Sequence, residues 1–425
     1  MKTGGLSLDQ APQLSVPMSF FLTVPAGILL AGCILITMGM AALISPWMPQ
    51  TLALTHAGTL GVLAMGMVGA LYQMTPVVAG TAVPLTRIAH FVHVFLLAGL
   101  AGLVWRLLGG PASAMSAAIV CFTIALLAFL LPLAWALLGS AIKNDTVRAM
   151  QLALLSLAII TVTGLSMARG FAGGIFSENR MLWVQFHLTV ALLGWVGGLI
   201  MAVSWQVVPM FYLASNVSKT TMRWFFWLLL SGLILPLVVA LSAAKINSPV
   251  SHGQLLAIGA LPAALVIWLL HPALILRKIS RRKRKRSDAS LLFWRAGLGT
   301  ALLMIPVTTA VLLLPDPRWQ VLFGWLAIWG WAAMIMHGML SRIVPFLLWY
   351  HRFSPRLGFE PVPSMRSLLS QQRIKTGFVL HLASVALGVI AIFTQVQLLA
   401  QLTGLLLVAV AISLASMLIH VLLHR

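Results

Sequence analysis

The chain has 425 residues, of which 61% are hydrophobic and only 8% are charged. Because a soluble domain needs more polar residues than this to cover its surface, the composition indicates a polytopic helical membrane protein. Long unbroken apolar runs also exclude a β-barrel, whose strands alternate between apolar and polar residues.

Twelve apolar runs are long enough to cross a bilayer as helices. They cover residues 18–45, 53–79, 88–108, 114–140, 148–168, 182–213, 222–244, 252–276, 290–314, 319–349, 374–396 and 398–423. The first run is too long for the apolar part of a signal peptide, so we expect a retained helix. The predicted fold is an all-α, single transmembrane domain over residues 1–425 with twelve spans.

Basic residues are concentrated in alternate loops, which predicts the orientation of the chain. The loops after odd-numbered spans contain few of them: Arg169, Arg180, Lys245 and Arg318. The loops after even-numbered spans contain many more, including Arg87, Lys143, Lys219, Arg352 and Arg373. We therefore expect a multi-pass protein of the bacterial cytoplasmic (inner) membrane with both termini in the cytoplasm.

The densest basic block follows the eighth span and accounts for much of the net charge of +21. It contains Arg277, Lys278, Arg281, Arg282, Lys283, Arg284, Lys285 and Arg286. A cytoplasmic anchor that contacts anionic lipid is the preferred interpretation. Nucleic acid is not expected as a partner.

Spans 2, 6 and 10 share one spacing, a glycine followed after fourteen residues by a proline. The three stretches are Gly61–Pro76, Gly194–Pro209 and Gly330–Pro345, and their prolines are 133 and 136 residues apart. This interval predicts three four-helix units, roughly 18–140, 148–276 and 290–423, related by a pseudo-threefold axis along the membrane normal. The alternative is that glycine and proline are simply common in transmembrane helices.

Acidic residues are absent from the predicted spans, so histidine is the main candidate for chemistry there. The six acidic residues, which we place outside the spans, are Asp9, Asp145, Glu178, Asp288, Asp316 and Glu360. This argues against proton sites made of carboxylates and against carboxylate metal centres. His56 and His187 stand 20 and 22 residues before their repeat prolines, which puts them at similar depth. His337 stands eight residues before Pro345, so it lies deeper by about 18 Å than His56.

Imidazoles without carboxylates or thiolates suit a haem iron or a copper ion. The candidate cofactor ligands are His56, His187 and His337, with His93 as a further metal ligand and Arg180 as a partner of haem propionates. The alternative for each histidine is a structural hydrogen bond to a neighbouring helix. Arg180 is otherwise an interfacial residue. Several glycines follow His56 and His187 in their spans: Gly58, Gly61, Gly66, Gly69, Gly194, Gly197 and Gly198. They either leave a flat slot for a haem macrocycle or allow close helix packing.

Two further features of span 10 have alternative interpretations. Met334, Met336 and Met339 surround His337, either as a Cu(I) environment or as apolar filler. Arg342 in the same span either extends to the interface or binds an anion.

The stretches HAGTLGVLAMGMVGALYQMTPVVAG, FHLTVALLGWVGGLIMAVSWQVVPMF and HGMLSRIVPFLLWYH look like subunit I of the haem–copper oxidases and its divergent relatives, near the NnrS-type haem proteins linked to nitric oxide tolerance. The twelve spans and threefold units resemble the same group. The resemblance implies haem b, with His56 as the ligand of a low-spin haem and His187 at the position of a copper ligand.

The chain also departs from that family. Span 7 lacks the adjacent histidine pair that would hold copper, span 10 has His337 in place of a His-x-His pair, and the tyrosine motif of the oxidases is missing. The LGHTGR motif associated with NnrS-type proteins is absent as well. The oxygen-reducing centre of an oxidase is therefore not expected here.

Three functions follow as hypotheses. The first is a membrane protein that binds haem, and in one version also copper, and acts in respiratory redox or nitric oxide stress physiology. Under this hypothesis the protein is not an oxygen reductase and has a respiratory redox partner. The second is a transporter or channel for a small molecule or metal without carboxylate-based proton coupling, motivated by Gln73 and Gln206 inside spans 2 and 6. The third is an assembly partner of a respiratory complex without a cofactor.

Overall fold

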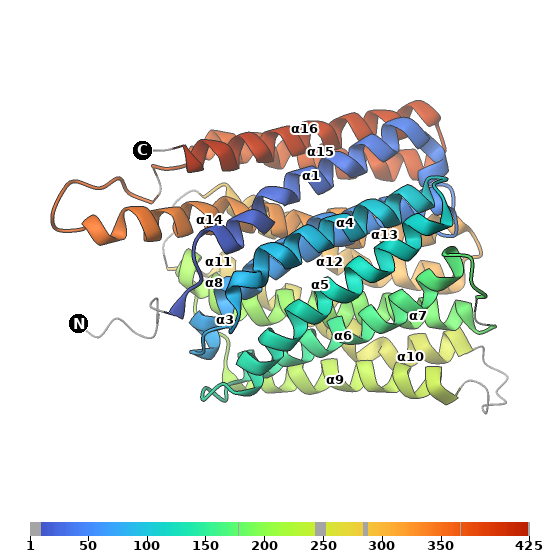
Figure 1. Ribbon diagram of the computed structural model, residues 1–425, viewed down its shortest axis with the longest axis horizontal. Helices are drawn as coiled ribbons and strands as arrows, with labels where there is room; N and C mark the ends of the chain where they lie inside the picture. Colours follow the sequence, from blue (N-terminus) through green and yellow to red (C-terminus); the bar gives the residue numbers. More distant parts are fainter. Residues whose placement is uncertain (1–9, 177, 243–251, 284–287, 366, 424–425) are drawn as a thin grey trace. The chain divides into compact units, whose positions relative to one another are not determined.

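A computed structural model of the protein describes residues 10–176, 178–242, 252–283, 288–365 and 367–423 (Figure 1). In these residues the secondary structure is helical and contains no strand. Twelve helices in them are long and apolar enough to cross a membrane. The prediction of an all-α polytopic membrane protein is confirmed, and every predicted span overlaps one of these helices.

The spans are built as follows, in chain order. The first is α1 (Ser15–Met38) with η2 (Gly39–Ala42), the second is α2 (Pro49–His56), η3 (Ala57–Ala64) and α3 (Met65–Ala79), the third is η4 (Thr86–Ile88) with α4 (Ala89–Leu107), and the fourth is α5 (Ala112–Leu138). The fifth is α6 (Asp145–Phe171), the sixth is α7 (Arg180–Thr189), η5 (Val190–Gly197) and α8 (Gly198–Tyr212), the seventh is α9 (Lys219–Ser242), and the eighth is α10 (His252–Leu265), η6 (Val266–Leu270) and α11 (His271–Ser280). The ninth is α12 (Ser290–Leu313), the tenth is α13 (Pro317–Trp325), η7 (Leu326–Ala332) and α14 (Ala333–Arg352), the eleventh is α15 (Gln371–Thr394), and the twelfth is α16 (Gln397–Leu422).

Each span with the repeated glycine and proline has the same internal construction. A short α-helix passes into a π-helical segment, and a longer α-helix follows. The repeat glycine lies inside the π-helical segment, η3, η5 or η7, and the repeat proline lies inside the following helix, α3, α8 or α14. A π-helical segment carries a surplus residue in the helix and interrupts its regular hydrogen bonds. The sequence spacing therefore corresponds to a repeated local structure.

The repeat glycines also share a packing role. A side chain on Gly27 of α1 would overlap the backbone of Gly61, a side chain on Gly194 would overlap Ser156 of α6, and a side chain on Gly330 would meet Thr300 of α12 at 2.7 Å. In each case the preceding span approaches the glycine closely. The third and fourth spans of each predicted unit also pair, since α4 packs on α5, α9 on α10, and α15 on α16. The pseudo-threefold relation between the units stays a prediction.

The three repeat spans are the most buried of the described spans. In the most apolar window of spans 2, 6 and 10, 83%, 67% and 83% of the residues are buried, against 28% to 56% in the other nine. Their burial makes them the spans most able to hold a shielded site.

The described chain divides into two compact units. Unit 1 is formed by the described parts of Met1–Ala11, Met74–Lys285 and Ala301–Pro306, and unit 2 by those of Pro12–Gln73, Arg286–Thr300 and Val307–Arg425. In unit 1, α5 packs against α4 and α6, and α10 packs against α9. In unit 2, α16 lies against both α1 and α15 (Figure 1), and the two π-helical segments η3 and η7 pack on each other.

Exposed tryptophans stand near the ends of several spans. They include Trp105 near the end of α4, Trp135 near the end of α5, and Trp224 and Trp227 in the first turns of α9. Tryptophan is enriched where a helix passes through the membrane–water interface. This distribution agrees with a multi-pass membrane protein.

Candidate functional site

A buried pair of histidines in unit 2 is the most concentrated chemistry inside the described spans. His337 comes from α14 and His381 from α15, and 3% and 0% of their surfaces are exposed. Their Nδ1 atoms are 3.1 Å apart. His337 was predicted as a ligand, whereas the pairing with His381 was not predicted.

The π-helical segment η7 orients this pair. The Nε2 atom of His381 lies 3.1 Å from the backbone oxygen of Trp329 in η7. Because a carbonyl only accepts hydrogen bonds, Nε2 carries the proton and donates, and Nδ1 of His381 carries the lone pair. That lone pair accepts the Nδ1 proton of His337. A π-helical segment leaves backbone carbonyls without regular partners, and His381 provides a donor for one of them.

Apolar and aromatic groups from α12, α14 and α15 enclose the two imidazoles. The ring centre of Phe293 is 4.5 Å from that of His337, and Phe378 packs edge-on against Phe293. Gly338 allows Phe293 to approach α14, because a Cβ on Gly338 would overlap Phe293. On the other side, a Cβ on Gly377 would lie 3.1 Å from Nε2 of His337 and 3.4 Å from Oγ of Ser413. The pair therefore sits in a dry environment with two neutral rings.

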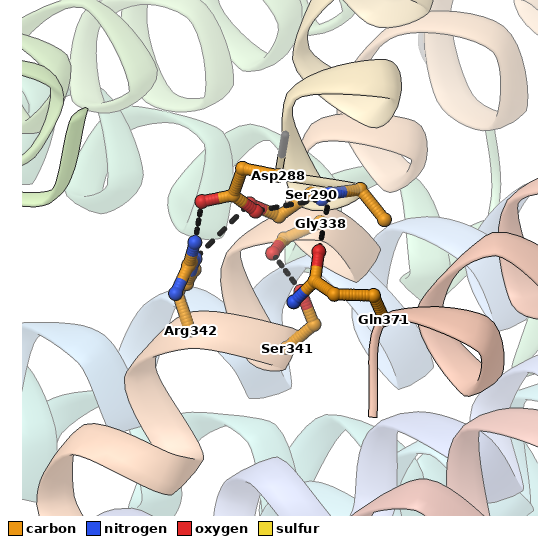
Figure 2. Close-up of polar contacts among 7 residues, drawn as sticks. Asp288, Ser290, Gly338, Ser341, Arg342 and Gln371 are labelled. Carbon is orange, nitrogen blue, oxygen red and sulfur yellow. Dashed lines mark hydrogen bonds and ion pairs between the residues drawn. The ribbon is translucent and has the colours of Figure 1, made fainter. Parts of the chain in front are cut away.

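An ion pair lies further along α14, five residues after His337. Arg342 pairs with Asp288, and their side chains are only 17% and 11% exposed. Figure 2 shows Asp288 between Arg342 and Ser290, with Gln371 reaching the adjacent backbone. The hydroxyl of Ser290 donates to Asp288 at 2.7 Å and accepts from Nε of Arg342 at 3.1 Å, and Oε1 of Gln371 accepts from the backbone of Ala289 at 2.8 Å.

This network ties the start of α12 to α14 and to the start of α15. A small pocket borders it and is lined by Ser341, Arg342, Pro345, Met365, Leu369, Gln371 and Ile374. Since Asp288 compensates the charge of Arg342, the pocket has a polar wall without a net cation. The ion pair with Asp288 was not among the interpretations of Arg342 from sequence, which were extension to the interface and anion binding.

His56 ends α2, immediately before the π-helical segment η3 in unit 2. Its Nδ1 donates to the backbone oxygen of Leu52 at 2.8 Å, so Nε2 is the nitrogen with the lone pair. The residue as a whole is of intermediate exposure. An imidazole held through Nδ1 with a lone pair on Nε2 is the usual arrangement of a histidine that binds a metal.

The other three candidates belong to unit 1. His187 lies three residues before the start of η5, and its Nδ1 is 2.9 Å from the hydroxyl of Thr163, which in turn donates to the carbonyl of Ile159. This again leaves the lone pair on Nε2. His93 is partly exposed on α4. The guanidinium of Arg180 lies over the ring of Phe176 at 4.1 Å, so its flat face is already occupied by an aromatic partner.

The glycines near the two histidines serve close helix packing. Gly58 faces Ile328 and Trp329, Gly66 faces the sulfur of Met336, and Gly69 faces Phe20 and Phe21. In span 6, Gly197 faces Ile267 and Gly198 faces Leu229. The packing alternative is therefore the one that the structure shows, and Met336 fills space in an apolar helix.

A second buried histidine environment occurs in unit 1. His271, the first residue of α11 and 2% exposed, has Nε2 at 2.8 Å from the hydroxyl of Ser204 on α8. That hydroxyl lies 2.8 Å from the carbonyl oxygen of Met201. Here Nε2 of one imidazole is paired with a serine hydroxyl, which is itself bonded to its own helix α8.

His381 and Asp288 are the site residues that sequence reasoning missed as ligands or partners. His381 stands alone in its span and Asp288 borders the basic block, so neither belongs to a motif. In the described residues, no group of three or more histidine, cysteine, aspartate or glutamate side chains is placed to hold a metal ion.

Comparison of the chain with protein-family models and with curated protein sequences found no match.

Proposed function

We propose that this chain is a haem-binding integral membrane protein of the haem–copper oxidase subunit I-like type, with a role in respiratory redox or nitric oxide stress physiology and without oxygen reduction. The observation that carries the proposal is the matched geometry of His56 and His187. Each precedes a π-helical segment of a repeat span, and each holds its Nδ1 against an oxygen.

The two imidazoles fit the role of axial haem ligands, because a fixed ring with a lone pair on Nε2 is what iron requires. The glycine-lined slot does not fit, since neighbouring groups fill those positions. We therefore propose that haem iron binds Nε2 of each imidazole, each within its own unit, and not in the glycine-lined slot. A bound haem b would supply one-electron chemistry or binding of a diatomic gas, and His56 in unit 2 and His187 in unit 1 would each serve as an axial ligand within their own unit.

An absorption spectrum of the purified protein, expressed with ample haem, tests this proposal. We expect a Soret band that is lost or shifted in His56→Ala and in His187→Ala. His271→Ala is the matched control, because His271 is committed to Ser204, and it should leave the band unchanged. Colourless wild-type protein would reject the proposal.

The same proposal places the chain in the bacterial inner membrane with both termini in the cytoplasm. The basic residues at the end of α11 support it: Lys278 bonds Ser215 and the carbonyl of Asn216 in the neighbouring loop, and Arg277, Arg281 and Lys283 stand nearby in the chain. We propose anionic lipid as the partner of this segment. Arg284, Lys285 and Arg286 lie outside the described residues. Reporter fusions at each end, compared for cytoplasmic and periplasmic activity, test the orientation.

One observation favours the transporter hypothesis as a second candidate. Oε1 of Gln73 is buried in span 2 and has no hydrogen-bond partner among the described residues. A buried acceptor without a partner is expected where a polar solute binds and supplies the missing hydrogen bond. Gln206, its counterpart in span 6, is exposed, so the two glutamines are not equivalent. Solute uptake by proteoliposomes that is unaffected by haem removal and lost in Gln73→Leu would favour this candidate.

A further inference from the structure

We propose that His337 and His381 form a two-coordinate site for Cu(I), separate from the haem ligands. The inference does not depend on the proposed function. It concerns a pair of residues on α14 and α15, whereas the family resemblance places copper near His187 in span 6.

The distance between the two rings suits a shared ion. Two nitrogens 3.1 Å apart can both bind one metal at about 2.0 Å, with an angle of about 100° at the ion. A small outward movement of either ring opens this angle toward the wider one that two-coordinate Cu(I) prefers. In that state Cu(I) takes the place of the proton between the two Nδ1 atoms, and the proton of His337 moves to its Nε2.

The outer nitrogen of His381 has a backbone acceptor. Nε2–H of His381 donates to the Trp329 carbonyl. Nε2 of His337 and Oγ of Ser413 both border the space left by Gly377. Histidines that bind metals typically donate their second N–H to such a group, which fixes the tautomer and orients the ring. The pair thus has two nitrogens facing each other on the inside and, at His381, a fixed partner on the outside.

The burial of the two rings and the lack of a compensating charge beside them among the described residues favour a univalent ion over a divalent one. The two rings contact Phe293, Gly377 and the backbone of Trp329, and the carboxylate of Asp288 is committed to Arg342. A divalent ion would leave two uncompensated charges in a dry environment, which is costly. A univalent ion with nitrogen ligands costs less, and Cu(I) combines single charge with affinity for imidazole. This argues for Cu(I) over Zn²⁺ or Cu²⁺.

Anaerobic Cu(I) titration of the full-length protein in detergent, against a chromophoric chelator, tests the site. We expect about one tightly bound copper per chain, with X-ray absorption that shows imidazole nitrogen and no sulfur in the first shell. His337→Leu and His381→Leu should each weaken binding by more than about 100-fold, beyond the loss caused by removing an outer partner. His271→Leu, which removes an equally buried but single imidazole, is the control and should bind copper like the wild type.

Three results would overturn the proposal. They are wild-type protein that takes up no copper, sulfur in the first shell, and unchanged affinity in His381→Leu. The X-ray absorption of the wild type decides even where a variant fails to fold. A normal Soret band without copper uptake would reject this copper site and support the haem proposal. Copper uptake by colourless protein would support the copper site and reject the haem proposal.

Discussion

Spans 2 and 10 of unit 2 have the same construction and differ at one decisive position. In each, a short helix ends at the residue that precedes the π-helical segment, and that residue stands twenty positions before the repeat proline. In span 2 it is His56, a residue of intermediate exposure with a lone pair on Nε2. In span 10 it is Trp325, a buried indole that donates to the carbonyl of Val385 at 3.0 Å.

The two side chains differ in whether a nitrogen remains to bind a ligand after the structural hydrogen bond is made. An indole has a single donor, and in Trp325 this donor is used to attach α13 to α15. An imidazole has two nitrogens, and in His56 one remains after the bond to Leu52. The same framework thus holds a structural anchor in one span and a potential ligand in the other. In span 10 the chemistry is displaced to His337, twelve residues further along the chain.

The largest expected effect on stability is the difference between substituting Trp325, the structural anchor, and substituting His56, the potential ligand. Trp325→Ala removes a buried ring that α15 accommodates at Gly388, where any Cβ would overlap the indole. We expect a loss of about 3–5 kcal/mol in the free energy of unfolding. His56→Ala, on a residue of intermediate exposure, should cost only about 1 kcal/mol. Unfolding of both variants in mixed micelles measures the contrast, and equal losses would contradict the division into anchor and ligand.

Glycine substitutions give an effect of intermediate size. Gly27→Ala places a methyl group against the backbone of Gly61 in span 2, which cannot yield, and we expect a cost of about 1–3 kcal/mol. In span 10, Gly330→Ala meets the side chain of Thr300, which can turn aside, so its cost should be smaller.

The control for both is Gly324→Ala on α13, where no atom lies within 4 Å of the added group. Because alanine favours a helix over glycine, this variant should gain about 0.5–1 kcal/mol. Thermal unfolding measures the three variants, and we expect Gly27→Ala to be the least stable, Gly330→Ala to be intermediate and Gly324→Ala to be the most stable. A destabilised Gly324→Ala would contradict the argument that the contacts of each glycine determine its sensitivity to substitution.

The spans themselves were predictable from the sequence because length and apolar composition decide whether a helix crosses a membrane. The Gly–Pro spacing also pointed to the right places, since Gly61, Gly194 and Gly330 each permit a close approach of the preceding span. The π-helical segments at these glycines were not predicted. An inserted residue changes the rotation of a helix without changing its composition.

The candidate site was predictable only in part. His337 was recognised because it is a histidine inside a repeat span. Its partner His381 is 44 residues away on a helix without a motif, and the two rings meet only because of how α14 and α15 are rotated. Likewise, the sequence alone does not connect Arg342 to Asp288, because the carboxylate stands outside the apolar run and reaches the span through the packing of α12.

The smallest expected effect concerns how the two spans begin. α13 begins with Asp316 as its N-cap, whose carboxylate accepts from the backbone N–H of Arg318 at 2.9 Å and pairs with the Arg318 side chain. These hydrogen bonds to Arg318 lower the pKa of Asp316. A lowered pKa means that the stabilisation is present above the unfolded value of about 4 and is lost as the pH falls through the folded value. The start of α2, with Met48 as its N-cap, has no side-chain cap and should add no such pH dependence.

Asp316→Asn isolates this term, because asparagine keeps the capping oxygen and removes the charge. Above pH 5 the variant should be slightly less stable than the wild type, and the difference should vanish as the pH falls below the folded pKa of Asp316. Unfolding midpoints in mixed micelles from pH 6 to pH 3 measure it. A difference that persists at low pH would assign the effect to cap geometry instead of charge, and the contrast between the starts of spans 2 and 10 would then rest on the side-chain cap alone.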